Sequence, residues 1–141
     1  MNYKNDDIGK IILVKGIVFE NKANNRKELD PAYKVGRPVL IIHSDDEFDY
    51  VLTLTSNYNS IYNNDLMHFI LCDNDFLYKN FKQKTVGAVK LEYVYKIPMC
   101  GHREICKLKY DVYKEVVLSL KTFHKKVNLD DIIECAELIK R

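Results

Sequence analysis

The residues best suited to chemistry flank a predicted β-hairpin. Residues 38–44 (PVLIIHS) and 49–56 (DYVLTLTS) have the composition of two strands joined by a polar turn. Arg37 precedes the first strand, and Thr55 and Ser56 end the second, so all three meet at one rim of the hairpin. A guanidinium donates a planar fork of hydrogen bonds to phosphate oxygens, and two hydroxyls could donate from the opposite side. The pattern favours a phosphate-binding rim, although each residue alone is also an ordinary surface or turn residue.

Lysines and tyrosines alternate through the second half of the chain, as in KLEYVYK (90–96) and KLKYDVYK (107–114). Cations for phosphates and exposed rings for bases are what single-stranded RNA-binding surfaces combine. The bland alternative is a solvated strand face with half-buried tyrosines. The candidate RNA contacts are Lys90, Lys107 and Lys109, together with Arg26, Lys27 and Lys34 from the polar segment before the hairpin. Net charge is only +2, so the whole-molecule field adds little to this argument.

Metal-binding spacing is nearly absent from the sequence. The segment CGHREIC brings Cys100, His102 and Cys106 together, but a structural zinc site needs four ligands, usually in paired short spacings, and no second pair follows. We therefore expect free thiols and no metal or other cofactor. His43 and His68 are candidates for acid–base work because imidazole titrates near neutrality, and are otherwise half-buried strand residues.

Length and composition predict one globular domain over residues 1–141. Hydrophobic residues make up 47% of the chain and charged residues 30%. No apolar run approaches the roughly 20 residues of a membrane span. The first ten residues, MNYKNDDIGK, lack the basic region followed by an apolar one that a signal peptide needs. We expect a cytoplasmic protein with no membrane partner.

The apolar patterning predicts an α+β fold, a small curled antiparallel β-sheet or barrel with C-terminal helices. Expected strands cover residues 11–20, 38–44, 49–56, 67–72, 85–98 and 105–109, with a long loop at 21–36. Expected helices cover 75–83, a segment capped by Asp111, and 128–141. One face of the long strand should carry Val89, Leu91, Tyr93 and Tyr95, and the helix after Asp111 should bury Val112, Val116, Leu120 and Phe123.

The order of these segments resembles that of the MazF/PemK-like toxins. The resemblance lies in GKIILVKGIVF, RPVLII, VLTLTS, VGAVKLEYVYKIP and a helix near DVYKEVVLSL, and it covers most of the chain. DPAYKVGRPVLII resembles the Asp-Pro-Thr-Tyr stretch that precedes a basic residue in ToxN-like toxins, and LTLTS resembles their Leu-Thr-Ser. ToxN-like proteins are the endoribonucleases of type III toxin–antitoxin systems, and this short chain is most similar to their compact CptN/TenpN branch.

The resemblance implies a role for four residues. Tyr33 matches the loop tyrosine of the family, Arg37 its basic residue (lysine in some members), and Thr55 and Ser56 its Thr-Ser. It implies a metal-independent, sequence-selective endoribonuclease that cuts mRNA and is inhibited by an RNA antitoxin in an oligomeric assembly. The extended helices of larger members are missing here.

Metal-free RNA cleavage uses the neighbouring 2′-OH as nucleophile and leaves a cyclic phosphate and a 5′-hydroxyl. Positioning and electrostatic stabilisation then dominate catalysis. Tyr33, a histidine, or Arg37 as proton donor could serve in proton transfer. Two alternatives stay open: a MazF-type toxin restrained by a protein antitoxin, and a small-barrel module that binds RNA without cutting it.

Overall fold

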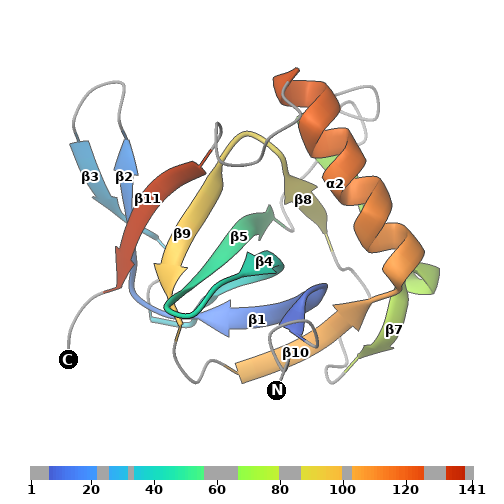
Figure 1. The fold of residues 1–141 in the computed structure, drawn as a ribbon. Coiled ribbons are helices and arrows are strands. Elements are labelled where there is room, and N and C mark those ends of the chain that lie inside the picture. Colours follow the sequence, from blue (N-terminus) through green and yellow to red (C-terminus); the bar gives the residue numbers. More distant parts are fainter. Residues whose placement is uncertain are drawn as a thin grey trace.

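A curled, mostly antiparallel sheet forms the body of the computed structural model, which describes residues 7–21, 26–31, 34–55, 67–79, 87–99, 103–125 and 133–138 (Figure 1). The strands are β1 (Lys10–Val14), β2 (Ile17–Asn21), β3 (Arg26–Leu29), β4 (Arg37–Ser44), β5 (Phe48–Thr55), β6 (His68–Ile70), β7 (Phe76–Lys79), β8 (Ala88–Lys90), β9 (Val94–Pro98), β10 (Arg103–Leu108) and β11 (Ile133–Leu138). A short 3₁₀ turn, η2 (Asp73–Asp75), precedes β7, and the helix α2 (Tyr110–His124) follows β10.

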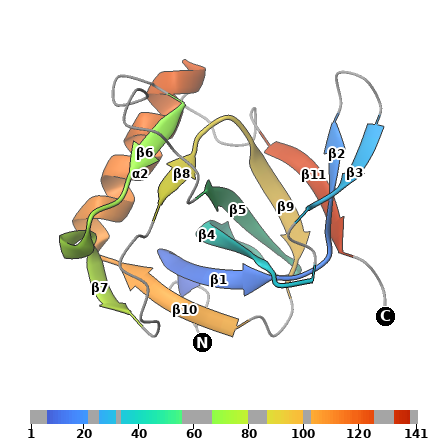
Figure 2. The ribbon, with the colours of Figure 1, turned by 180° about the vertical axis from the view of Figure 1, so that it is seen from behind.

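The strand order defines the path of the curled sheet. Neighbours along the sheet run β3-β2-β11-β9-β5-β4-β1-β10-β7. A branch leaves this path at β5, which also pairs with β8, and β8 in turn pairs with β6. The pairs are antiparallel except for β11 with β9. Within the described residues the path ends at β3 and β7, so the sheet is curled but is not closed as a barrel. In both side views α2 runs along the side of the molecule where β7 and β8 lie (Figures 1 and 2).

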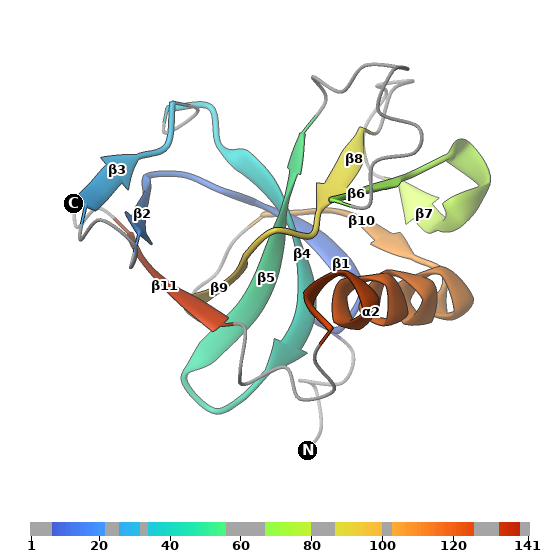
Figure 3. The same ribbon diagram turned by 90° about the horizontal axis from the view of Figure 1, so that it is seen from above.

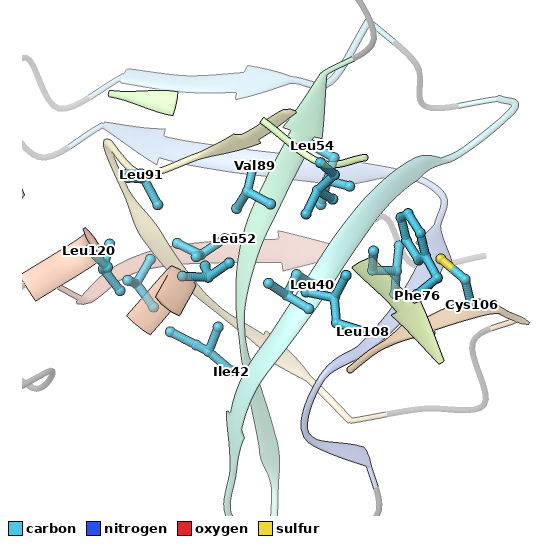
Figure 4. Close-up of a cluster of buried hydrophobic side chains, with 14 residues drawn as sticks. Leu40, Ile42, Leu52, Leu54, Phe76, Val89, Leu91, Cys106, Leu108 and Leu120 are labelled. Atoms are coloured by element: carbon cyan, nitrogen blue, oxygen red, sulfur yellow. The ribbon is translucent and has the colours of Figure 1, made fainter. Parts of the chain in front are cut away.

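Two apolar clusters pack on opposite faces of the central strands. Alternate residues of β4 divide between them, because side chains in a strand point to opposite faces in turn. The larger cluster, which we call the helix-side core, packs under α2 (Figure 4) and contains Ile11, Leu40, Ile42, Leu52, Leu54, Leu71, Phe76, Val89, Leu91, Val94, Cys106, Leu108, Val116 and Leu120. The smaller one, the hairpin-side core, contains Ile12, Val14, Ile17, Val39, Ile41, Val51 and Ile97.

Much of the expected fold is confirmed. The predicted strands at 38–44, 49–56, 67–72 and 105–109 correspond to β4, β5, β6 and β10. The predicted apolar face of α2 is also right, since Val116 and Leu120 are fully buried and Val112 and Phe123 pack against them. Asp111 lies in the first turn instead of capping the helix; the N-cap is Lys109, in an extended conformation.

The expected strand 11–20 and loop 21–36 are partly wrong. The chain turns at Gly16, between β1 and β2. The φ of Gly16 is 72°, a value that glycine adopts readily. β3 occupies residues predicted to be loop, and it pairs with β2 from Val18 opposite Leu29 to Asn21 opposite Arg26. The polar residues of β3 form a strand because they pair with β2, and their residue types alone do not indicate this pairing.

The long strand expected at 85–98 is broken, and its predicted single face is wrong. β8 and β9 both pair with β5, but their registers on β5 differ by three residues, which Leu91 to Tyr93 take up. An odd insertion reverses the side-chain alternation. Val94 is therefore buried, whereas Tyr93 is 38% exposed.

Two predicted helices are wrong where the structure describes them. Residues 76–79 form β7, which pairs with β10 and buries Phe76, and residues 133–138 form β11 between β9 and β2. Residues 80–83, 128–132 and 139–141 lie outside the described residues. Partner strands override helical propensity in both places. In the described part of the chain, no helix is both long and apolar enough to span a bilayer.

Candidate functional site

Arg37 and Thr55 end up side by side, as the hairpin pattern predicted. Arg37 begins β4 and pairs with Val14 of β1. Val39 lies opposite Thr53, and continuing this register sets Arg37 opposite Thr55 at the end of β5. The start of β4 and the end of β5 lie at the same end of these two central strands when the sheet is seen from above (Figure 3). We call this place, with Asp30, Arg37, Leu54 and Thr55, the Arg37 rim.

A buried carboxylate holds the Arg37 guanidinium. Nε donates to Oδ2 of Asp30 at 2.9 Å and Nη2 donates to Oδ1 at 2.7 Å, while Nη1 donates to the carbonyl oxygen of Leu54 at 3.3 Å. The Asp30 side chain is 1% exposed and that of Arg37 is 24% exposed. Two parallel hydrogen bonds fix the plane of the guanidinium as well as its position.

Sequence reasoning missed Asp30 as this partner. Asp30 directly follows β3, and its backbone N–H donates to the carbonyl oxygen of Ile17 at 2.8 Å. The β2–β3 hairpin therefore carries the carboxylate back to the start of β4. The one available signal is the DPAY motif itself, an acid seven residues before a cation, which lay within the segment expected to be a loop.

Gly36 sets the approach to Arg37. Its φ is +100°, and a Cβ built on it would lie 2.6 Å from Cγ of Leu13. Both the backbone conformation and the close packing exclude a side chain. The chain can therefore turn into β4 against β1, which aims the Arg37 side chain at Asp30.

The charge balance defines what the Arg37 rim can do. The hydrogen bonds to Asp30 are the main cause that raises the pKa of Arg37, so the guanidinium is always charged. Three of its five N–H groups are used in the bonds above, which leaves two for a ligand as far as the described residues go. The carboxylate also offsets much of the positive charge. Arg37 can thus offer oriented donors more than a strong attractive field.

Of the other predicted catalytic residues, the structure describes only Thr55. It is half-buried and takes part in a polar interaction of its own. Tyr33 and Ser56 lie outside the described residues.

The described histidines do not lie at the Arg37 rim. His43 is six residues along β4, about 20 Å away, and its ring packs 5.3 Å from that of Tyr50. His68 is three strand spacings from Arg37, roughly 14 Å. A ring nitrogen of His124 lies 2.7 Å from the carbonyl oxygen of Leu91. The hydrogen bonds of the guanidinium run to Asp30 and Leu54, not to these histidines.

No family model, curated protein or solved structure matches the chain. The resemblance to ToxN-like toxins therefore stays a prediction, and the candidate site rests on its own geometry.

The predicted RNA-binding lysines are divided between distant places. Lys107 and Lys109 lie where β10 passes into α2, whereas Lys90 lies on β8, beside the far end of the helix. A helix of 15 residues is about 22 Å long, so these lysines do not form one patch. Exposed Lys27 and Lys34 flank Asp30 in the chain, and the side chain of Arg26 lies outside the described residues.

The described residues contain no group of three His, Cys, Asp or Glu side chains that could hold a metal ion. Cys106 is buried on β10 and forms no disulfide with the described residues. Cys100 and His102, the other members of the CGHREIC segment, lie outside the described residues.

Proposed function

We propose that this protein is a metal-independent endoribonuclease of the cytoplasm that cuts single-stranded RNA. One observation carries the proposal: the Arg37 guanidinium is held by buried Asp30 where β4 begins, next to the half-buried hydroxyl residue Thr55 at the end of β5. A guanidinium fixed in this way needs no rearrangement to meet developing charge, which is the condition for strong transition-state stabilisation.

The chemistry follows from the placement of donors. The 2′-oxygen of a ribose attacks the adjacent phosphorus, the bond from phosphorus to the 5′-oxygen breaks, and a 2′,3′-cyclic phosphate and a 5′-hydroxyl result. The two remaining N–H groups of Arg37 bind non-bridging oxygens and stabilise the added negative charge of the phosphorane. The Thr55 hydroxyl donates from the neighbouring strand. The 2′-OH loses its proton and the departing 5′-oxygen gains one. The family resemblance places Tyr33 and Ser56 among the catalytic residues, with Tyr33 as a candidate for this proton transfer.

The resemblance also proposes the biological setting. A ToxN-like toxin would have a MazF/PemK-like fold, would cut cellular mRNA and would be held inactive by an RNA antitoxin in an oligomeric assembly. Short direct repeats in the DNA just upstream of the coding sequence would support an RNA antitoxin. A small acidic open reading frame there would support a protein antitoxin instead.

A second candidate is a module that binds RNA without cutting it. One observation favours it, because Asp30 already takes much of the hydrogen-bonding capacity and charge of Arg37. The two candidates bind the same ligand and differ in whether a bond is broken.

Incubating the purified protein with single-stranded RNA in EDTA separates them. Cleavage should proceed and leave cyclic phosphate and 5′-hydroxyl ends. Thr55→Val should slow it by about a hundredfold, which is the common effect of losing one transition-state donor. The matched control is Thr122→Val, which removes an exposed hydroxyl from α2. This variant should cut at the wild-type rate. Intact RNA would favour the binding module, and cleavage that stops in EDTA and returns with a divalent ion would overturn the metal-free mechanism.

A further inference from the structure

A groove lies where β7, β10 and the first turn of α2 meet. Its volume is about 420 Å³, which is in the range of small-molecule sites. Its lining residues are Ile8, Leu77, Lys107, Leu108, Tyr110 and Tyr113, and we call it the Tyr110 groove. The groove adjoins the helix-side core, because Leu108 belongs to that cluster and Tyr113 packs against it. The Arg37 rim lies elsewhere: Arg37 is on the face of β4 that carries Val39 and Ile41 of the hairpin-side core.

The groove presents an aromatic platform with a fixed base. Tyr110 is 69% exposed, and its ring stacks on that of Tyr113 with centroids 6.1 Å apart and planes at 23°. The Tyr113 hydroxyl donates to the carbonyl oxygen of Ile42 at 2.6 Å, which ties the lower ring to β4. An exposed ring on an anchored ring loses little freedom when a flat group stacks on it.

Cations surround this platform. Nζ of Lys114 lies 5.0 Å from the centre of the Tyr110 ring, Lys107 lines the groove and exposed Lys109 precedes the helix. An exposed cation–π contact is weak, about 0.5–1 kcal/mol, so a base can displace the ammonium from the ring. The freed ammonium stays within reach of a phosphate on the same nucleotide.

Carboxylates also lie near the groove. Lys10 pairs with Asp7 at 3.0 Å and with Glu104 at 3.4 Å, and Glu104 also accepts a hydrogen bond from Tyr78. Exposed Asp111 is the acid in the first turn of α2. Within the described residues Lys109 and Lys114 form no ion pair, and cations placed in this way beside an exposed ring match a ligand that has a flat aromatic group and an adjacent anion.

We infer that the Tyr110 groove binds an unpaired nucleotide of single-stranded RNA. The base stacks on Tyr110, exposed Leu77 forms an apolar wall, and Lys109 and Lys114 bind the flanking phosphates. Stacking and phosphate contact of this kind do not depend on base identity. The inference goes beyond the proposed function, because it requires RNA as ligand but no cleavage at the Arg37 rim.

The test measures binding of a fluorescein-labelled oligoadenylate of about ten nucleotides, a length that one small fold can cover. Tyr110→Ala should weaken affinity by about tenfold, as loss of one stacked base does, and Tyr110→Phe should stay within twofold of the wild type. Replacing Lys109 and Lys114 by glutamine should flatten the dependence of affinity on salt by about 0.7 in the log–log slope for each phosphate that is no longer neutralised.

Tyr93→Ala is the matched control, because Tyr93 is also exposed and packs against a second tyrosine, Tyr95, at 5.9 Å. It should leave affinity unchanged. The inference is overturned if Tyr110→Ala binds like the wild type, or if Tyr93→Ala loses as much affinity. A variant with Asp30→Asn and Arg37→Met should show the same dependence on Tyr110. Loss of cleavage with this dependence intact would leave the inference standing, and absence of cleavage in the wild type would count against the proposed function alone.

Discussion

The Arg37 rim and the Tyr110 groove are built in opposite ways. At the rim, the anchoring group is a buried carboxylate, and the cation is held by two hydrogen bonds and partly neutralised. In the groove the anchor is a tyrosine hydroxyl bonded to the backbone, and the ring above it and the lysines around it are exposed. The first arrangement fixes donors in space, and the second supplies surface and charge. Fixed donors suit a transition state, whereas exposed rings and exposed cations suit the capture of a ligand.

This difference predicts how substitutions act. At the Arg37 rim, changes should lower stability and activity together, because the same bonds position the donors and satisfy a buried charge. In the Tyr110 groove, changes to exposed groups should alter affinity and leave stability nearly unchanged.

The largest expected effect comes from removing Arg37 alone. Arg37→Met removes the guanidinium from the buried carboxylate of Asp30, and breaking a buried pair in this way costs about 3 kcal/mol or more of unfolding free energy. Adding Asp30→Asn removes the buried negative charge and should recover at least half of that loss. Urea unfolding of both variants measures the difference. Lys34→Met, which changes an exposed cation in the same segment, should stay within about 0.5 kcal/mol of the wild type. Equal losses in the single and double variants would show that the pair contributes no such coupling.

A smaller loss is expected at the turn into β4. Gly36→Ala should lower the unfolding free energy by about 1–3 kcal/mol, because alanine is strained at φ of +100° and its Cβ would overlap Leu13. If the overlap contributes, Leu13→Ala should cost less in the Gly36→Ala background than in the wild type. Thermal melts of the four proteins in this cycle provide the test. Full additivity would assign the whole loss to backbone strain.

In the groove, Tyr113→Phe should separate stability from binding. Loss of the hydroxyl removes a hydrogen bond worth about 1 kcal/mol, but the ring stays, so RNA affinity should change less than twofold. Burial raises the pKa of Tyr113 above 10.0, so the neutral form is favoured in the folded state. The contribution of the Tyr113 hydroxyl to the unfolding free energy is fully present below pH 10, and it declines as the pH rises from there toward the pKa of Tyr113 in the folded state. Unfolding curves from pH 8 upward should therefore fall more steeply for the wild type than for Tyr113→Phe; parallel curves would contradict this.

The sequence predicted the parts of the site that depend on local pattern. The hairpin at 38–56 has two apolar strands and a turn rich in acids, and this pattern was enough to place Arg37 beside Thr55. Asp30 was missed because it reaches Arg37 only through pairing between β2 and β3, whose residues are largely polar. The alternation of lysine and tyrosine in residues 107–114 indicates part of the Tyr110 groove, but the anchoring bond from Tyr113 to Ile42 spans 71 residues and leaves no local pattern.

The errors in the fold have the same origin. Residues 133–138 have acids and apolar residues at helical spacing, yet they form a strand because β2 and β9 offer paired neighbours on either side. The strand at 85–98 is broken by a three-residue change of register on β5, which the alternation in its own sequence does not show. Long-range pairing decided both cases.

The most direct test of catalysis at the Arg37 rim is the rate of RNA cleavage in EDTA at saturating RNA, measured for three proteins in parallel. Relative to the wild type, the variant with Asp30→Asn and Arg37→Met should cut at least a hundredfold more slowly, because it lacks the fixed donors of the Arg37 rim. Tyr110→Ala should cut at the wild-type rate once RNA is saturating, because it loses affinity only. A folded double variant that cuts as fast as the wild type would contradict the assignment of catalysis to the Arg37 rim.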